Sequence, residues 1–332
     1  MGDTARQHLG REQAYEYEMV VKEPRLRVST GEIFSVATED STNGSIRSVG
    51  QLPVSEVLGP QAIHRQFNPC AGPIFVTGAR PGDVLAVRIH DIEVDQQGVN
   101  CFFPDHGPLA DSAAFPECRG PYTKIIRHLP GPSGTTSDGT AVLDQKTQWP
   151  LQPHIGTIGT VPDRPVAAGS DTLFGQTRHG GNMDCRDICA GSVVLLPVAV
   201  EGAFLYLGDV HGTMADGEFI GNADECRALV TLSCEVVAQK SIPWVRVETP
   251  DAIIQLNSYR PLEASVKQAF LWLMGWLMDD YGFTAREAYL HLGLNPGVRI
   301  RVYQLVDDGR FMYTSGVSFP RSSLPLETRP WP

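Results

Sequence analysis

The sequence lacks an excess of basic charge. It contains 27 Lys and Arg against 38 Asp and Glu, for a formal net charge of -11. Nucleic-acid binding relies on Lys and Arg to neutralise phosphates, so this balance argues against such a partner. No stretch approaches the ~18 consecutive apolar residues of a membrane span. The polar residues 1–11 also lack the apolar core of a signal peptide. We therefore expect a cytoplasmic protein that contacts neither membrane nor nucleic acid.

The sequence also lacks the common nucleophile and thiolate-metal motifs. It has seven cysteines, an odd number, and no CxxC pair, which is typical of reduced, buried thiols. There is no Gly-x-Ser-x-Gly elbow. Cys101, Cys185 or Cys189 remains an alternative nucleophile with a distant histidine. That alternative would leave the acidic residues described below without a role.

The pattern along the chain predicts mainly β structure. We expect strands at 84–94, 193–200, 204–207, 228–237 and 244–249, with long loops around short strands between 100 and 180. The exceptions lie near the C-terminus. Residues 261–278 predict a helix, and 282–290 predict a second one, with Thr284 and Glu287 as its capping box. A strand at 298–305 follows. We divide the chain at 1–110, 111–260 and 261–332, and expect the three parts to form one intertwined unit.

The most informative feature is a group of acids and one histidine among glycines. Asp184 follows Gly180 and Gly181, and the segment 208–218 holds Asp209, His211, Asp216 and Glu218. Asp, Glu and His are the usual ligands of hard or borderline divalent metals. Asp209 and His211 are two residues apart, so on an extended strand both point to the same face.

We therefore predict a metal site with Asp184, Asp209, His211 and Glu218 as ligands. Glu218 and His211 are also the candidate catalytic residues, Glu218 as a general base if it is not a ligand. Zinc suits the histidine best, whereas calcium or magnesium suits the carboxylates. Backbone amides of Gly180–Gly181 or of a glycine-rich loop at 156–159 are candidates for stabilising an oxyanion.

Several neighbouring residues can be interpreted in two ways. Asp184 and Asp216 are also turn formers, and Asp40 fits a plain Asx turn. Glu225 is a weaker candidate, as a solvated or outer carboxylate. His154 is an exposed loop histidine or a substrate contact. Asn68 is a turn residue or a partner of a substrate amide, and Gly181 is a further candidate for substrate binding.

Six separated motifs, in order, resemble the acetamidase/formamidase family. They cover roughly residues 25–310 and lie at 68–76, 81–85, 153–159, 180–184, 191–198 and 208–218. The chain departs from the family pattern at 212–215, where a glutamine is usual, at His154, and at Cys185 and Cys189. These departures leave the expected metal ligands intact and bear on the substrate.

The resemblance implies a fold and an activity. The fold is mainly β, sandwich- or jelly-roll-like with barrel-like strands, plus a smaller α/β C-terminal portion. The activity is hydrolysis of a small neutral carboxamide, such as formamide or acetamide, to carboxylate and ammonia by a metal-activated water. The alternatives are a hydrolase of larger or cyclic amides on the same metal site, and a non-catalytic metal-stabilised binding protein.

The resemblance also implies an oligomer, and the helix at 262–278 offers a surface for one. Phe270–Met278 is an almost unbroken apolar stretch, whereas a surface helix of a monomer shows a polar face. We expect a homodimer that uses this helix. The alternative is a helix enclosed between two layers of one subunit.

Overall fold

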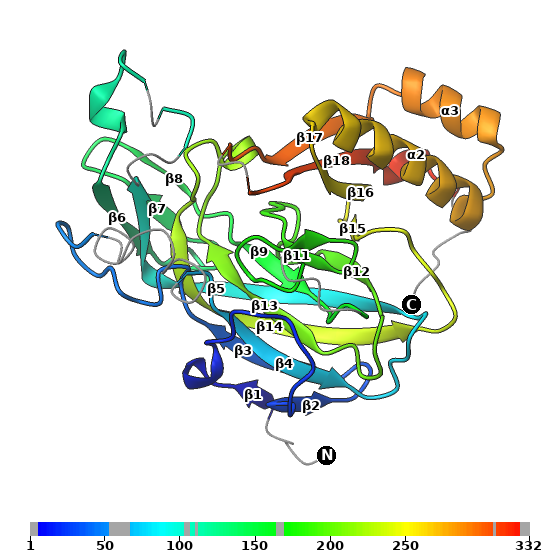
Figure 1. Cartoon of the computed structure of the whole chain (residues 1–332), viewed down its shortest axis with the longest axis horizontal. Helices are drawn as coiled ribbons and strands as arrows, with labels where there is room; N and C mark the ends of the chain where they lie inside the picture. The colour runs from blue at the N-terminus through cyan, green and yellow to red at the C-terminus, as the bar shows by residue number, and fades with distance from the viewer. Residues whose placement is uncertain are drawn as a thin grey trace.

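A long antiparallel ladder between strands β5 (Val84–Phe102) and β14 (Glu225–Val237) runs through the body of the protein (Figure 1). The computed structural model describes residues 6–52, 67–102, 107–109, 112–163, 169–307 and 310–325. The expected strands at 84–94 and 228–237 are both present, and both are longer than the pattern predicts. Two irregularities in their pairing, at 226–228 and 231–232, interrupt the regular alternation of side chains.

The neighbouring strands extend this ladder into one curled, mostly antiparallel sheet. Strand β14 also pairs with β3 (Ile33–Thr38) and β13 (Leu205–His211). Strand β13 continues to β4 (Cys70–Val76) and β9 (His154–Gly159), and β9 to β11 (Gly180–Asn182), which pairs with β10 (Gln176–Thr177). The short strands β1 (Gln7–Leu9) and β2 (Leu26–Val28) add parallel pairings to β3 and β4.

Two further groups of strands leave β5 in different directions. The far end of β5 pairs with β6 (Tyr122–Leu129), which leads to β7 (Thr140–Val142) and β8 (Gln148–Pro150). Its near end pairs with β12 (Val193–Pro197), which leads to β15 (Arg246–Glu248) and β16 (Ala252–Tyr259). Strand β16 pairs with β18 (Tyr313–Pro320), and β18 with β17 (Arg299–Gln304). Pairing thus crosses residues 110 and 260, and the division of the sequence there stays a prediction.

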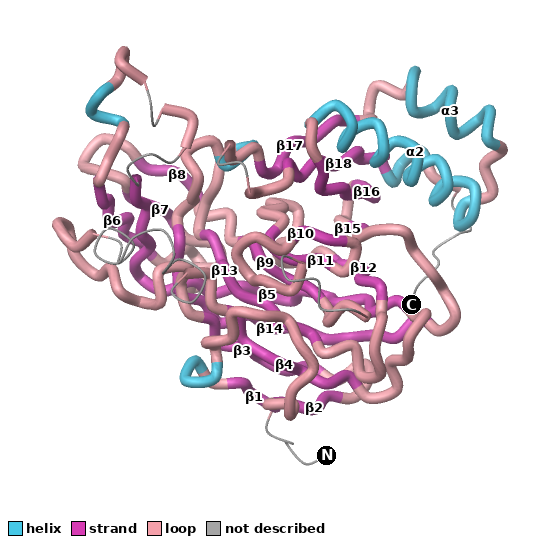
Figure 2. Tube along the Cα trace, in the orientation of Figure 1, coloured by secondary structure: helices cyan, strands magenta, loops and turns pink. Residues whose placement is uncertain are grey.

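The helices of the described chain follow the sequence pattern closely (Figure 2). Helix α2 (Leu262–Tyr281) and helix α3 (Ala285–Leu294) lie beside β16–β18, and Thr284 and Glu287 form the expected capping box. Short 3-10 turns occupy η1 (Arg11–Gln13), η3 (Pro116–Cys118), η4 (Asp216–Glu218) and η5 (Arg321–Ser323). Among the described residues, neither helix combines the length and apolar character that a membrane crossing requires.

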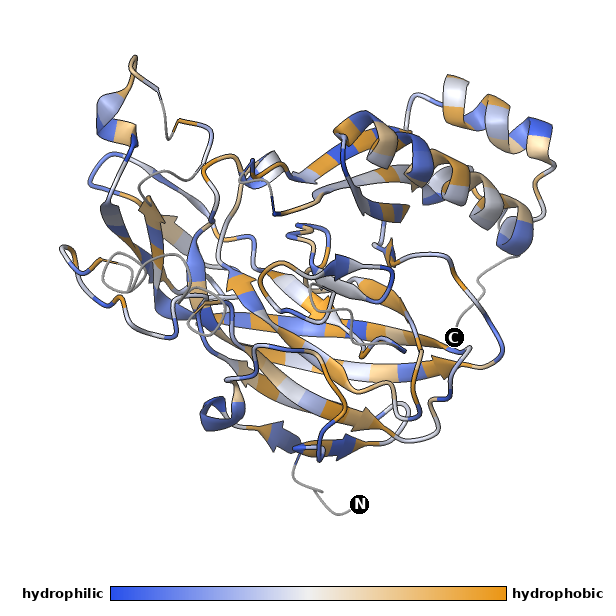
Figure 3. Ribbon diagram, viewed as in Figure 1, coloured by the Kyte–Doolittle hydropathy of each residue, from blue (hydrophilic) through white to orange (hydrophobic). Residues whose placement is uncertain are grey.

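Apolar side chains fill two main clusters. The larger one lies within the β body and includes Phe34, Ile89, Leu205 and Val230. In Figure 3 the strands of this body alternate between hydrophobic and hydrophilic positions, as expected when a strand has one buried face. The second cluster packs α2 against β16 and β18 through buried residues that include Trp276. The mainly β fold with a smaller α/β C-terminal portion is therefore confirmed.

Candidate active site

Five buried polar side chains converge at one end of β13. Asp209 and His211 belong to β13, Asp184 follows β11, Glu218 ends η4, and Glu225 begins β14. Each is less than a tenth exposed. Two triplets have ligand-type atoms within 4.8 Å of one another: Asp184, His211 and Glu218, and Asp209, His211 and Glu225. The structure therefore brings together all four predicted ligands and adds Glu225.

Backbone pairing explains how distant segments meet here. Strand β9 lies between β11 and β13, with Thr157 opposite both Asn182 and Gly208. The preceding residue of β9, Gly156, faces Asp184 and Asp209. A Cβ atom on Gly156 would lie 2.7 Å from Asp209 Oδ2 and 2.8 Å from Asp184 Oδ1. A glycine is therefore required for the two carboxylates to approach each other.

The expectation that Asp209 and His211 share a face because the strand is extended is wrong. Asp209 has a φ of 54°, so the strand is not extended at this residue. The side chains nevertheless meet, with His211 Nε2 3.5 Å from Asp209 Oδ1 and 3.4 Å from Glu225 Oε2. Asp184 and Glu218 also have positive φ values, of 48° and 46°. Left-handed backbone at three acids is strained and is typical of functional sites.

His211 is held from behind by a chain of hydrogen bonds. Its Nδ1 lies 3.2 Å from His154 Nε2, and His154 Nδ1 lies 3.0 Å from the carbonyl oxygen of Gln152. A carbonyl only accepts, so His154 Nδ1 carries its proton. In a neutral His154 ring, Nε2 is then an acceptor for His211 Nδ1–H. This assignment makes Nε2 the His211 ring nitrogen that faces the carboxylates, where it binds either a proton or a cation.

The charges of this group are poorly balanced by the protein alone. Burial, and next the charge of Asp209, raise the pKa of Asp184 to about 7. Burial and Asp184 likewise raise the pKa of Glu218 well above its usual range. Burial lowers the pKa of His211, but Glu225 and Asp209 outweigh it and raise that pKa well above normal. Four buried carboxylates and one imidazole therefore require added positive charge, as protons or as a cation.

The unpaired atoms of the group fit a divalent cation. Both carboxylate oxygens of Asp184, His211 Nε2 and Glu225 Oε2 are buried without a hydrogen-bond partner. Ligand atoms 2.0–2.6 Å from one ion lie at most about 5 Å apart, which agrees with the 4.8 Å limit of both triplets. Asp184, His211 and Glu218, or Asp209, His211 and Glu225, are the residues that would hold such an ion.

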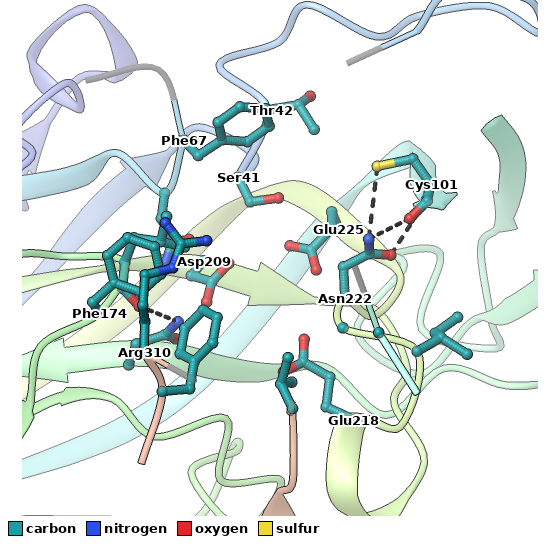
Figure 4. A pocket seen from close by; sticks show the side chains of 18 residues that line it. Ser41, Thr42, Phe67, Cys101, Phe174, Asp209, Glu218, Asn222, Glu225 and Arg310 are labelled. Carbon is teal, nitrogen blue, oxygen red and sulfur yellow. Dashed lines mark hydrogen bonds between the residues drawn. The ribbon is translucent and has the colours of Figure 1, made fainter. Parts of the chain in front are cut away.

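A cavity of about 110 Å³ opens onto this group (Figure 4). Asp209, Glu218 and Glu225 line its polar side. The remaining lining is largely apolar and includes Phe67, Phe174 and Phe311. Pockets for drug-sized ligands occupy roughly 300–1,000 Å³, so this cavity suits a much smaller molecule.

The three predicted substrate contacts lie in different places. Asn68 lines the cavity. Its Nδ2 donates to Thr157 Oγ1 and to the carbonyl of Thr172, which leaves the buried Oδ1 unpaired. His154 is buried in β9 behind His211, so the expected exposed loop is wrong there. Gly181 is packed in β11, where an added Cβ atom would lie 1.9 Å from the carbonyl oxygen of Gly175. Neither His154 nor Gly181 is among the residues that line the cavity.

The glycine-rich segments differ from the loops expected for an oxyanion site. Residues 156–159 lie within β9, and Gly180–Gly181 lie within β11. The peptide groups of β9 and β11 face each other in an antiparallel ladder. A strand paired in this way directs its amides at its neighbour instead of at a ligand.

The remaining candidate residues have other roles or are unsuited to catalysis. The Asp40 carboxylate accepts from Thr42 and Gly44 and pairs with Arg47, as an Asx turn requires. Asp216 is largely exposed and pairs with Arg186. Cys101 lines the cavity, but burial raises the pKa of its thiol well above the usual value, which disfavours a nucleophilic thiolate.

Sequence reasoning underrated Glu225 because it considered spacing along the chain alone. In the structure, β13 and β14 pair so that His211 lies opposite Glu225. The available signal was the arrangement of two apolar strands around residues 212–224, which places residues 211 and 225 side by side. No such signal marked the phenylalanines that line the cavity, because Phe67, Phe174 and Phe311 come from three distant segments.

Comparison with known proteins agrees with this architecture. The model of the Acetamidase/Formamidase family matches residues 22–172 and 152–244. The acetamidase of Mycolicibacterium smegmatis is 27% identical over 310 residues, covering 69% of this chain and 74% of that protein. The chain spans 60% and 56% of the length of two further relatives, from Schizosaccharomyces pombe and Methylophilus methylotrophus.

Solved structures give the same result over nearly the whole chain. An acetamidase structure from Bacillus halodurans superimposes with a TM-score of 0.81 at 30% identity, covering 94% of this chain and 97% of the other. One from Yersinia enterocolitica gives 0.83 at 29% identity, with coverages of 97% and 93%. The chain therefore belongs to the acetamidase/formamidase family.

Proposed function

We propose that this protein hydrolyses the C–N bond of a small neutral carboxamide, releasing a carboxylate and ammonia. The observation that carries the proposal is a buried group of four carboxylates and a histidine that opens into a cavity of about 110 Å³. The names of the related acetamidase from Mycolicibacterium smegmatis and formamidase from Methylophilus methylotrophus agree with this reaction. The small cavity favours such amides over larger or cyclic ones.

The cavity provides a partner for each end of the substrate. Asn68 Oδ1 has no protein donor, and both amide protons of Asn68 are already used by Thr157 and Thr172. This oxygen is therefore suited to accept a hydrogen bond from the substrate NH₂ group. The apolar part of the lining is then available to the acyl group.

We assign Glu218 to proton transfer. It lines the cavity, and burial with the charge of Asp184 raises its pKa well above the usual carboxyl range, as is typical of general acid–base catalysts. In this role it takes a proton from the attacking water and returns one to the leaving nitrogen. The alternative role is that of a metal ligand in the triplet with Asp184 and His211.

We propose a divalent cation, zinc in preference to calcium or magnesium, held by the two triplets that share His211. When bound, such an ion supplies Lewis acidity, which polarises a carbonyl and acidifies water. The choice of zinc rests on His211 Nε2, a buried imidazole nitrogen without a hydrogen-bond partner among the carboxylates. We keep cytoplasmic location as a proposal, because all seven cysteines are free thiols.

The decisive experiment measures ammonia release from formamide, acetamide and propionamide by purified protein, together with its metal content. Release that is abolished in Asp209→Ala supports the proposal. Activity confined to a lactam would instead support the cyclic-amide alternative. Tight metal binding without turnover of any amide would support the non-catalytic alternative and contradict the proposed function.

A further inference from the structure

The apolar wall of the cavity is built around two phenylalanines from distant segments. Phe174 precedes β10, and Phe311 precedes β18. Their rings lie 5.0 Å apart at an interplanar angle of 53°. Figure 4 shows Glu218 and Glu225 on one side of the cavity and Phe67 and Phe174 on the other, with Asp209 and Arg310 beside Phe174. A substrate whose amide contacts Glu218 and Glu225 therefore directs its acyl group at these phenylalanines.

Phe311 is fixed through its backbone by Arg260, which lies two residues before helix α2. Arg260 Nε donates to the carbonyl of Phe311 at 2.6 Å, and Nη2 donates to the carbonyl of Val306 at 3.2 Å. Nη1 pairs with Asp307 at 3.3 Å, and the guanidinium lies 4.2 Å from the ring centre of Tyr313. One side chain thus binds both ends of the connection between β17 and β18.

Two other contacts fix the same connection to the rest of the site. The buried Gln176 accepts from the amide of Met312 at 2.7 Å through Oε1. Its Nε2 donates to Thr314 Oγ1 at 3.0 Å. The amide of Leu305 donates to the carbonyl of Gly217 at 2.8 Å, next to Glu218. The position of Phe311 relative to the acids is therefore set by the protein before a substrate binds.

We propose that Phe311 sets the upper size limit of the acyl group and that Arg260 is the residue that positions it. The inference rests on the proposed function, because it concerns the acyl side of that substrate. A cavity of about 110 Å³ has room for a short acyl chain. Phe311 admits acetamide and propionamide and rejects benzamide. A difference of one methylene group in a tight pocket changes kcat/KM by roughly 10–200-fold.

The first test compares wild type with Phe311→Ala and the milder Phe311→Leu. The quantity measured is the ratio of kcat/KM for acetamide to that for butyramide and for benzamide. We expect this ratio to fall at least ~10-fold in Phe311→Ala. Phe174→Ala removes the adjacent ring and provides a second variant in case Phe311→Ala does not fold. Phe115→Ala is the matched control, because Phe115 is 52% exposed and does not line the cavity.

A double-mutant cycle tests the role of Arg260. If Arg260 acts on selectivity through Phe311, then Arg260→Ala lowers the ratio in wild type and leaves it unchanged in the Phe311→Ala background. A general structural effect would lower activity on all amides equally in both backgrounds. Additive changes of the ratio would contradict the positioning role.

Calorimetric titration of butyramide compares binding without turnover. The two proteins are Glu218→Gln and Glu218→Gln combined with Phe311→Ala. Tighter binding by the protein that also carries Phe311→Ala supports the size limit, even if wild type hydrolyses no amide and the proposed function fails. Unchanged selectivity and unchanged butyramide binding, with acetamide hydrolysis intact, would overturn the size limit and leave the proposed function standing.

Discussion

His154 Nε2 lies 3.2 Å from His211 Nδ1, with both rings buried, so each histidine determines where the other carries its proton. Because His154 Nδ1 donates to the carbonyl of Gln152, its Nε2 accepts from His211 Nδ1–H, and His211 Nε2 is left facing the acids. Residues behind a metal ligand commonly orient it in this way. His154 therefore belongs to the support of the site, although the sequence suggested that it contacts substrate.

Replacing His154 tests this relationship. His154→Phe removes the acceptor for His211 Nδ1–H and should weaken metal binding by about 10–100-fold. Competition with a coloured chelator measures the affinity without requiring turnover. His179→Phe is the control, because His179 is also buried but bonds to Thr177 and Gly169 instead. Equal metal affinity in wild type and His154→Phe would show that His154 does not orient His211.

Loss of a shared ligand should remove metal and activity together. His211 belongs to both triplets, so His211→Ala should abolish metal binding, whereas Asp209→Ala removes a ligand from one triplet only. Metal content by plasma mass spectrometry and ammonia release are measured on the same samples. Full activity after exhaustive chelation, in protein shown to be metal-free, would contradict the metal proposal.

Glu218→Gln separates the two roles of Glu218. As a proton-transfer residue, it should retain the fold and most of the metal while kcat falls about 10²–10⁴-fold. A parallel fall in metal content would identify Glu218 as a ligand. Asp216→Asn makes the same chemical change two residues away, at an exposed side chain that pairs with Arg186. That control should retain wild-type activity.

The acid sensitivity of the fold should depend on Glu39. Burial opposes ionisation of Glu39, but hydrogen bonds and charge from Arg227, with the amide of Asp40, outweigh it and lower its pKa. A lowered carboxyl pKa contributes stability above its unfolded value, near 4.5, that is lost as pH falls through the folded pKa. Glu39→Gln should cost about 1.5–3 kcal/mol at pH 7 and less at pH 3.

Urea unfolding at both pH values measures this difference. Glu23→Gln is the control, because Glu23 is 92% exposed and lies 4.0 Å from Arg27. Its free energy of unfolding should match wild type at each pH. An equal loss for Glu39→Gln at pH 3 and pH 7 would show that the missing contribution is not the ionised form.

The helix expected to form the homodimer has one face buried in the subunit and another, including Leu271 at 52% exposure, that lines a groove. Trp276 is fully buried in the subunit, so it cannot report on an interface. This apolar groove lies between α2, α3 and β17, where Leu290 and Leu294 are 50% and 75% exposed. Exposed apolar patches of this kind are typical of interaction sites. Light scattering should give a mass well above 36.2 kDa for wild type and near it for Leu290→Glu/Leu294→Glu. A wild-type mass near 36.2 kDa would contradict the dimer.

Sequence reasoning reached the fold and the acids for identifiable reasons. The capping box at Thr284 and the alternating pattern of β5 are local signals, and local chemistry decides them. It failed where structure depends on pairing between distant segments. Residues 156–159 read as a loop because of their glycines. In the sheet, Gly156 is a strand residue whose missing side chain makes room for two carboxylates.

Strand β13 is bonded along both edges, to β9 on one side and to β4 and then β14 on the other. Its peptide groups exchange hydrogen with solvent only when several strands separate together, which is close to global unfolding. Asp209 and His211 therefore lie in the part of the chain that opens most slowly. Heat should therefore inactivate this protein at its melting temperature. We expect no lower temperature at which the protein is still folded but Asp209 and His211 have separated.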